Sequence, residues 1–265
     1  MTEKNLKFRV GAVSYLNTVP LVWGMLHGEQ TKQVDISFSV PSECARQVET
    51  GAIDIGLVPV AEIARQGLDV VPGVGIACFG AVRSISLFSR VPWPEVRTLA
   101  ADLSSRTSVQ LARVILRECF GASAQIIERQ PALDAMLSES DAALIIGDPA
   151  LRLDPAALPY EHLDLGAEWT RLTGLPMVFA AWAGRSPDAA LQKITLDSYE
   201  FGRVRLDEII DREYRSRGVT RELASDYLHR YIRFTLGEFE MKGLRTFIDL
   251  ADLQEEKNAY ATTSH

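Results

Sequence analysis

Apolar segments about five residues long alternate with amphipathic segments over the first two thirds of the chain. Extended apolar or alternating patterns occupy 8–13, 34–40 and 53–58, and each is followed by residues that start and stop helices. The same alternation returns in a second block, with strands expected at 98–101, 124–128 and 142–146 and a helix that ends at Gly121. Strands that alternate with helices are typical of a mostly parallel sheet, so the pattern predicts an α/β fold.

Two extended crossings are expected between these blocks, near 85–91 and 180–186, because both stretches are apolar and poor in helix formers. Residues 160–173 look irregular, and everything beyond 186 looks helical. These features predict a two-lobed periplasmic-binding-protein-like fold (type II), in which two α/β lobes are joined by a two-segment hinge with C-terminal helices. The expected lobes are 1–88 plus 184–265, and 89–183, with a ligand cleft between them.

Neutral hydrogen-bonding side chains gather at two expected turns and strand ends. Ser14, Tyr15 and Asn17 follow the first strand, where ligands bind in α/β sheets, although Asn17 could equally satisfy the start of the next helix. Ser84 and Ser86 are two apart in an extended segment, so their hydroxyls are expected on one face, toward the cleft. A half-buried strand with serines on its wet face is the alternative.

The helix start at 104–108 is the best candidate anion site. Ser105, Arg106, Thr107 and Ser108 combine hydroxyls and a guanidinium with the partial positive charge of a helix N-terminus, although Ser and Thr are also common helix caps. Gly147 and Asp148 follow a buried strand; Asp148 could bind a substrate hydroxyl or cap the next helix.

Composition and charge narrow the function classes. The chain of 265 residues is 47% hydrophobic and 24% charged, as in ordinary folded proteins, and its net charge of −7 argues against a nucleic-acid partner. It has neither an export-signal pattern nor an apolar run long enough to cross a membrane, so we expect a cytoplasmic protein. The three cysteines and four histidines lack metal-ligand spacing, and phosphate-loop and dinucleotide motifs are missing, so no cofactor or metal is expected.

Short motifs spread over nearly the whole chain carry a family resemblance. They are 11–20 (GAVSYLNTVP), 51–59 (GAIDIGLVP), 83–86 (RSIS), 104–108 (SSRTS), 146–148 (IGD) and 173–176 (TGLP). In order and spacing, these motifs resemble those of the chorismate dehydratases of the futalosine route to menaquinone. The resemblance implies the same two-lobed fold and a cofactor-free loss of water from chorismate, giving 3-[(1-carboxyvinyl)oxy]benzoate.

The resemblance also implies roles for the candidate residues. Asn17 and Ser86 would be catalytic, with Ser14, Tyr15 and Ser84 beside the reacting ring. A substrate carboxylate would be held by residues 105–108. From the sequence itself, we favour Arg106 over Arg83 as the cation, because strand alternation points Arg83 away from the two serines. Since none of these candidate residues except Asp148 has a carboxylate or an imidazole, we expect the enolpyruvyl carboxylate of the substrate to be the base, with Asp148 as the alternative. A binding or sensing protein for a small anion, and another enzyme of the same pathway and fold, are the alternatives; the oligomeric state stays open.

Overall fold

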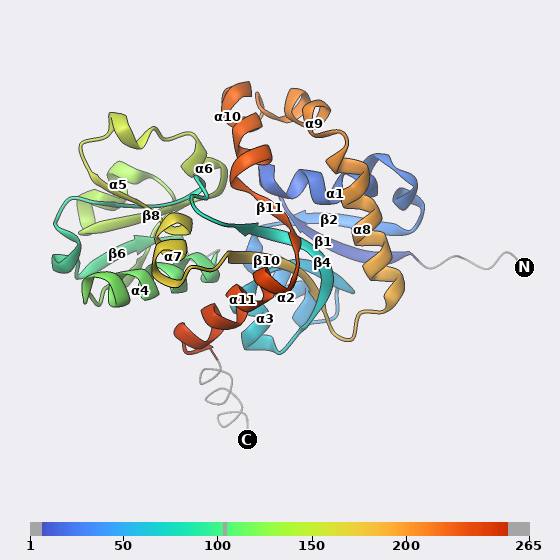
Figure 1. Cartoon of the computed structure of the whole chain (residues 1–265), viewed down its shortest axis with the longest axis horizontal. Helices are drawn as coiled ribbons and strands as arrows, with labels where there is room; N and C mark the ends of the chain where they lie inside the picture. Colours follow the sequence, from blue (N-terminus) through green and yellow to red (C-terminus); the bar gives the residue numbers. More distant parts are fainter. Residues whose placement is uncertain (1–6, 103–104, 254–265) are drawn as a thin grey trace, which may run out of the picture.

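Two β-sheets organise the chain (Figure 1). Residues from both sheets line the cavity described below. The computed structural model describes residues 7–102 and 105–253. The first sheet has the strand order β11-β4-β10-β3-β1-β2. Its strands are β1 (Phe8–Val13), β2 (Val34–Ser39), β3 (Ile55–Pro59), β4 (Asp69–Cys78), β10 (Met177–Gly184) and β11 (Arg233–Leu236). Strands β1, β2 and β3 pair in parallel, while β10 and β11 run antiparallel to their neighbours.

The second sheet has the order β7-β6-β8-β5-β9. Its strands are β5 (Ile85–Ser89), β6 (Thr98–Ala101), β7 (Gln125–Glu128), β8 (Ala142–Ile146) and β9 (Glu161–Asp164). Strands β5 and β8 are buried along their whole length, because β5 pairs with β8 and β9 and β8 pairs with β5 and β6. In both sheets, therefore, parallel strands are combined with antiparallel ones.

Helices cover these sheets and connect their strands. They are α1 (Val19–His27), α2 (Pro41–Glu49), α3 (Val60–Gln66), α4 (Arg106–Phe120), α5 (Leu133–Glu139), α6 (Gly147–Leu151), α7 (Leu165–Thr173), α8 (Ala189–Arg203), α9 (Leu206–Glu213), α10 (Arg221–Asp226) and α11 (Glu238–Leu250). Helix α4 buries Val109, Ala112, Ile115 and Leu116, which recur at helical spacing. It ends at Gly121, whose φ of 63° is the left-handed conformation that glycine adopts readily. No helix among the described residues is both long and apolar enough to cross a membrane.

Two strands belong to a different sheet from the one that the expected lobe boundaries assign to them. Strand β5 lies in the second sheet although 85–88 was expected in the first lobe, and β10 lies in the first sheet although 177–183 was expected in the second. The crossings therefore fall between β4 and β5 and between β9 and β10. The expectation was wrong because a fully buried strand and an extended linker share the same apolar, helix-poor sequence.

Two further segments differ from their expected structure. Residues 161–173 form β9 and α7, with Trp169 fully buried, where an irregular stretch was expected. Between 187 and 253, where only helices were expected, β11 adds an edge strand to the first sheet. A five-residue π-helix, Tyr227–Tyr231, precedes β11 and brings Tyr227 into the interior.

Candidate active site

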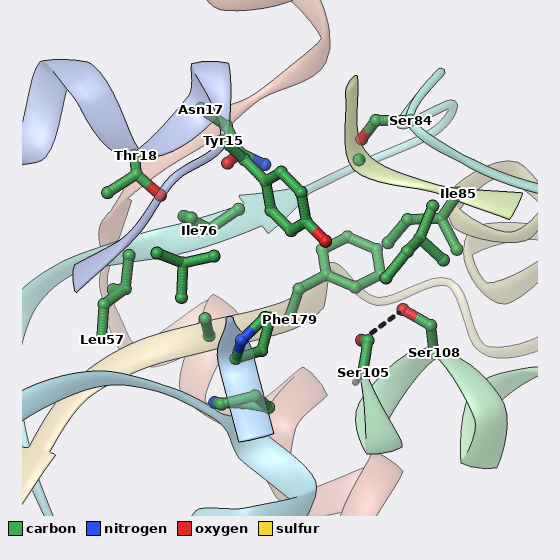
Figure 2. Close-up of a pocket in the computed structure, with 16 residues that line it drawn as sticks. Tyr15, Asn17, Thr18, Leu57, Ile76, Ser84, Ile85, Ser105, Ser108 and Phe179 are labelled. Atoms are coloured by element: carbon green, nitrogen blue, oxygen red, sulfur yellow. Dashed lines mark hydrogen bonds between the residues drawn. The ribbon is translucent and has the colours of Figure 1, made fainter. Parts of the chain in front are cut away.

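A cavity opens between the two sheets, with about 510 Å³ of space that includes the part open to solvent. Figure 2 shows the Tyr15 side chain extending into this space, with Phe179 and the Ser105–Ser108 pair near it. None of the residues that line the cavity in the described part of the chain is charged. The lining residues are Val13, Tyr15, Asn17, Thr18, Pro41, Leu57, Pro59, Ile76, Ser84, Ile85, Ser105, Ser108, Ile146, Gly147, Phe179 and Ala180.

The turn after β1 supplies the first polar wall. Residues 16–18 form one turn of 3-10 helix before α1, and this brings Tyr15, Asn17 and Thr18 to the cavity. Thr18 occupies the cap position of α1 but makes no side-chain cap bond, and its buried Oγ1 has no partner in the described structure. Helix capping therefore does not account for this hydroxyl, which is left available to a ligand.

A chain of hydrogen bonds joins this turn to the crossing between the sheets. The Asn17 amide Nδ2 donates to Tyr227 Oη at 2.9 Å, and the Tyr227 hydroxyl donates to Ser84 Oγ at 2.8 Å. All three side chains are buried, and Asn17 Oδ1 has no partner among the described residues. Burial raises the pKa of Tyr227, so its hydroxyl stays protonated. An unsatisfied acceptor and a serine hydroxyl thus border the cavity together.

Gly147 closes the cavity beside Tyr15. Its φ is 64°, and a Cβ built at this position would lie 2.7 Å from Tyr15 Cε1. Its N–H donates to the Ser84 carbonyl oxygen at 2.7 Å, so the turn after β8 is fixed to the start of β5. The position therefore requires glycine for both its backbone conformation and the close approach of the Tyr15 ring.

The start of α4 supplies two hydroxyls on the side of the second sheet. Ser105 Oγ and Ser108 Oγ are 2.9 Å apart and both line the cavity (Figure 2). Ser105 Oγ accepts no hydrogen bond from the backbone N–H groups of the first turn, which lack partners within a helix. Thr107 is buried and its Oγ1 accepts from the Ala61 N–H, and Ser104 lies outside the described residues. This end of α4 can hold an anion through hydroxyls and helix polarity.

Neither candidate arginine lies among the residues that line the cavity. Arg106 Nε pairs with Glu62 Oε1 at 2.8 Å and borders a separate surface hollow. Arg83 has a φ of 66°, and its guanidinium donates to the carbonyl oxygens of Ala150 and Leu153. The preference for Arg106 over Arg83 as the cation is therefore not supported by this arrangement, since each guanidinium has protein partners elsewhere.

Asp148 is buried beside the cavity but is not part of its lining. Its Oδ1 accepts from the Leu16 N–H at 3.0 Å, and its Oδ2 accepts from Arg217 Nη1 at 3.2 Å. Burial raises the pKa of Asp148, and these two donors oppose the rise. The carboxylate thus fixes the turn after β1, instead of capping α6 or facing the cavity.

Ser86 and Ser14 also lie outside the cavity lining. Ser86 Oγ is 3.1 Å from His162 Nε2, a partner that the sequence did not suggest. Ser84 precedes β5, because Arg83 has a positive φ and the strand begins at Ile85; the expected two-residue alternation does not extend to Ser84. Ser14 is exposed, and its carbonyl oxygen accepts from Arg217 Nη1.

Six of the eleven sequence candidates meet at the cavity, namely Tyr15, Asn17, Ser84, Ser105, Ser108 and Gly147. Sequence reasoning missed the apolar wall, because Leu57, Ile76 and Phe179 lie within strands whose pattern indicates only burial. It also missed Tyr227, which lies in the stretch beyond 186 that was expected only to be helical. Only the tertiary structure shows that the Tyr227 hydroxyl reaches the site.

Comparison with known proteins adds a family to this geometry. The model of the menaquinone biosynthesis family matches residues 8–252. A chorismate dehydratase of Thermus thermophilus is 30% identical over 264 residues, which cover 92% of this chain and 95% of that protein. The chain belongs to the menaquinone biosynthesis family. This membership confirms the resemblance carried by the sequence motifs. A second family relative, a chorismate dehydratase of Campylobacter jejuni, is 25% identical, covering 90% of this chain and 95% of its own.

Solved structures show that this family member has the periplasmic-binding-protein-like fold. An Archaeoglobus fulgidus protein superposes with a TM-score of 0.77 at 17% identity, covering 96% of this chain and 99% of its own. The periplasmic aliphatic sulphonate binding protein of Escherichia coli gives 0.65 at 17% identity, covering 96% and 93%. The expected two-lobed α/β architecture is confirmed, and at these identities the likeness concerns the fold alone.

Proposed function

We propose that this chain is a chorismate dehydratase, a carbon–oxygen lyase that converts chorismate to 3-[(1-carboxyvinyl)oxy]benzoate and water. The observation that carries the proposal is the 30% identity, over 92% of the chain, with the Thermus thermophilus enzyme of that name. The cavity is in keeping with it, because an apolar wall and hydroxyl-bearing walls suit a six-membered ring with oxygen substituents on its rim.

The reaction removes a proton and a hydroxyl from adjacent ring carbons. The proton leaves the carbon that bears the enolpyruvyl ether, and the electron pair of that C–H bond enters the ring as the neighbouring C–O bond breaks. The departing hydroxide takes up a proton and becomes water, and aromatisation of the ring supplies the driving force. The protein then has to orient the substrate, stabilise developing charge and bring a base within reach.

The base in this proposal is the enolpyruvyl carboxylate of the substrate. Among the described residues that line the cavity, none has a carboxylate or an imidazole. Asp148, the alternative base, has both oxygens bound to donors of the protein. A carboxylate that the substrate carries to its own ring proton needs only correct positioning, which intramolecular geometry makes effective.

The other roles follow from what borders the cavity. Asn17 and Ser84 polarise and hold the leaving hydroxyl, and Ser84 thus takes the place that the sequence suggested for Ser86. Ser105, Ser108 and the first turn of α4 receive the second carboxylate. Neutral groups and helix polarity thus bind a dianion in a protein of net charge −7.

The test is incubation of purified, chelator-treated protein with chorismate, followed by ultraviolet absorbance and mass spectrometry. The expected product is lighter than chorismate by one water. An Asn17→Ala variant purified in the same way controls for contaminating chorismate enzymes, because its signal should fall at least tenfold. Chorismate that binds but returns unchanged would favour a binding or sensing protein, and chorismate that does not bind would favour another enzyme of the pathway. The cytoplasmic location and the lack of a cofactor stay predictions.

A further inference from the structure

Tyr227 lies behind the polar wall of the cavity, and its hydroxyl contacts two lining residues at once. It accepts from Asn17 Nδ2 at 2.9 Å and donates to Ser84 Oγ at 2.8 Å. The ring is 1% exposed and starts the π-helix 227–231, a rare backbone form that often marks functional positions. Tyr227 itself is absent from the cavity lining, so it can act only through Asn17 and Ser84.

The hydrogen-bond directions fix what the cavity presents to a ligand. An amide nitrogen only donates, so the Asn17 NH2 uses the Tyr227 oxygen and leaves Oδ1 as a buried acceptor without a partner in the described structure. The single Tyr227 proton then goes to Ser84 Oγ. Ser84 consequently has its own proton left to donate, and the described residues provide no acceptor for it. The cavity wall thus offers one acceptor and one donor.

This pair matches an alcohol, which donates one hydrogen bond and accepts another. Resting on the proposed function, the alcohol is the ring hydroxyl that leaves chorismate. Its O–H would donate to Asn17 Oδ1, and its oxygen would accept a hydrogen bond from the Ser84 hydroxyl that strengthens as negative charge develops during departure. An ether or a ketone at the same place would leave Asn17 Oδ1 unsatisfied, at a cost that disfavours its binding.

We propose that Tyr227 is a positioning residue of this enzyme, which orients Asn17 as acceptor and Ser84 as donor toward the leaving hydroxyl of the substrate. Hydrogen bonds in series strengthen one another in a buried site, so the donation from Tyr227 also makes Ser84 a better donor. Because burial raises the pKa of Tyr227, the phenol keeps its proton throughout the neutral range.

The experiment compares Tyr227→Phe with Tyr199→Phe. Tyr199 is also a buried tyrosine, packed on Phe234, and it lies outside the cavity lining, so its variant controls for the loss of a buried hydroxyl. We expect Tyr227→Phe to lower kcat by about 10- to 100-fold, as for a weakened transition-state donor, and to change KM by less than threefold. Inhibition by the product, which lacks the ring hydroxyl, should be unchanged.

A double-mutant cycle tests the route through Ser84. In a Ser84→Ala background, Tyr227→Phe should lower kcat by a smaller factor than in the wild type, because only the contact of Tyr227 with Asn17 is then left to lose. A kcat for Tyr227→Phe within twofold of the wild type, an equal loss in Tyr199→Phe, or additive effects in the cycle would each overturn the inference. A wild type that does not convert chorismate would instead refute the proposed function.

Folding of the variant is checked by thermal unfolding. If Tyr227→Phe does not fold, 3-fluorotyrosine placed at position 227 keeps the size of the ring and makes the phenol more acidic. It should then raise kcat about twofold through stronger donation to Ser84, with the product inhibition constant unchanged. An unchanged kcat would count against the positioning role.

Discussion

Asn17 shows at the level of one residue how a cavity can bind a charged substrate although none of its described lining residues is charged. Its amide gives one hydrogen bond to the protein and keeps one acceptor for a ligand. An asparagine differs from an aspartate here by a single negative charge in a buried place, where charge repulsion is weakly screened. The neutral side chain is therefore a requirement for binding a dianion.

Exchange of Asn17 for aspartate tests this requirement. We expect Asn17→Asp to weaken chorismate binding by at least tenfold relative to Asn17→Ala, because both lose the amide donor and only the first adds a charge. Isothermal calorimetry on the two variants measures the difference, and kcat should fall in both. Equal chorismate affinities for the two variants would contradict the electrostatic argument.

Asp148 is the residue at which a structural and a catalytic role are separable. Asparagine keeps an oxygen for the Leu16 N–H and loses the ion pair with Arg217. We expect Asp148→Asn to retain kcat within about tenfold and to lower the free energy of unfolding by about 1–3 kcal/mol, the usual cost of a lost charge-assisted hydrogen bond. Steady-state kinetics and urea unfolding check both values. Loss of turnover with intact chorismate affinity would make Asp148 the base.

At the scale of elements, the turn between β8 and α6 shapes the cavity through Gly147. Gly121 at the end of α4 has nearly the same φ, 63° against 64°, but a Cβ there meets nothing within 4 Å. The two glycines therefore differ in their surroundings and not in their backbone conformation. Substitution of each by alanine separates conformational strain from collision with Tyr15.

We expect Gly121→Ala to cost about 1 kcal/mol of unfolding free energy and Gly147→Ala about 3 kcal/mol, since only the second adds a steric clash to the left-handed strain. Gly147→Ala should also lower kcat/KM at least tenfold by displacing the Tyr15 ring. Urea unfolding and chorismate kinetics on both variants provide the comparison. Equal losses of stability would show that the close contact with Tyr15 is unimportant.

The sequence predicted elements better than it predicted the direction of side chains. Turns after β1 and β8 and the start of α4 were expected from local residues, and their side chains Tyr15, Asn17 and Ser105 line the cavity. Arg106, in contrast, turns to Glu62, because side chains around a helix start spread over all directions and only tertiary packing selects the inner ones. The local sequence pattern thus predicted which segments line the site, but it did not predict which of their side chains point into it.

Strand β9 shows why some elements escaped the sequence. Its four residues include His162 and Asp164, which do not form an apolar run, yet the backbone pairs with β5 from Ser86 to Ser89. Short edge strands are stabilised by pairing rather than by their own pattern, and β11 is another such case. Long-range pairing is invisible to a local reading, which explains why both were missed.

His162 in β9 makes a pH dependence predictable. Burial lowers the pKa of its imidazole below the ordinary 6.5, so the unfolded chain takes up a proton more readily than the folded one. The neutral form thus contributes stability above pH 6.5, and this contribution is lost as the pH falls through the lowered folded value. Relative to His162→Gln, the wild type should lose stability between pH 8 and pH 5. Urea midpoints at several pH values test this, and parallel curves for the two proteins would contradict it.

At the scale of the molecule, the chain has two halves, each built on one of the two sheets. Contacts between α3 of the first half and α4 of the second join them next to the cavity. The Ala61 N–H donates to Thr107 Oγ1, and Glu62 binds both Arg65 and Arg106. On another side, Asp148 from the second half holds the Leu16 N–H of the first. These polar contacts thus set the distance between the two walls of the cavity, and their side chains are not among the residues that line it.

Substitution of Glu62 weakens the contact between α3 and α4 without changing a residue that lines the cavity. Glu62 is 4% exposed and its side chain is not among the cavity-lining residues, while Arg106 of α4 is half exposed. We expect Glu62→Gln to lower the free energy of unfolding by about 1–2 kcal/mol through weaker charge-assisted hydrogen bonds. Chorismate KM should rise by about three- to tenfold. In the variant, more of the ligand-free molecules would have the two halves apart, and binding would have to bring these halves together. The value of kcat should change less than twofold, since the bound state has the same walls.

Glu43→Gln is the matched control, because Glu43 pairs with Arg46 within the exposed face of α2 and does not bridge the halves. It should leave both KM and the urea midpoint unchanged. Small-angle scattering with and without chorismate adds a direct measure of closure, and the decrease in radius of gyration on binding should be larger in Glu62→Gln than in the wild type. A Glu62→Gln variant that loses stability but keeps KM and scattering unchanged would show that the ion pair stabilises the fold without setting the distance between the cavity walls.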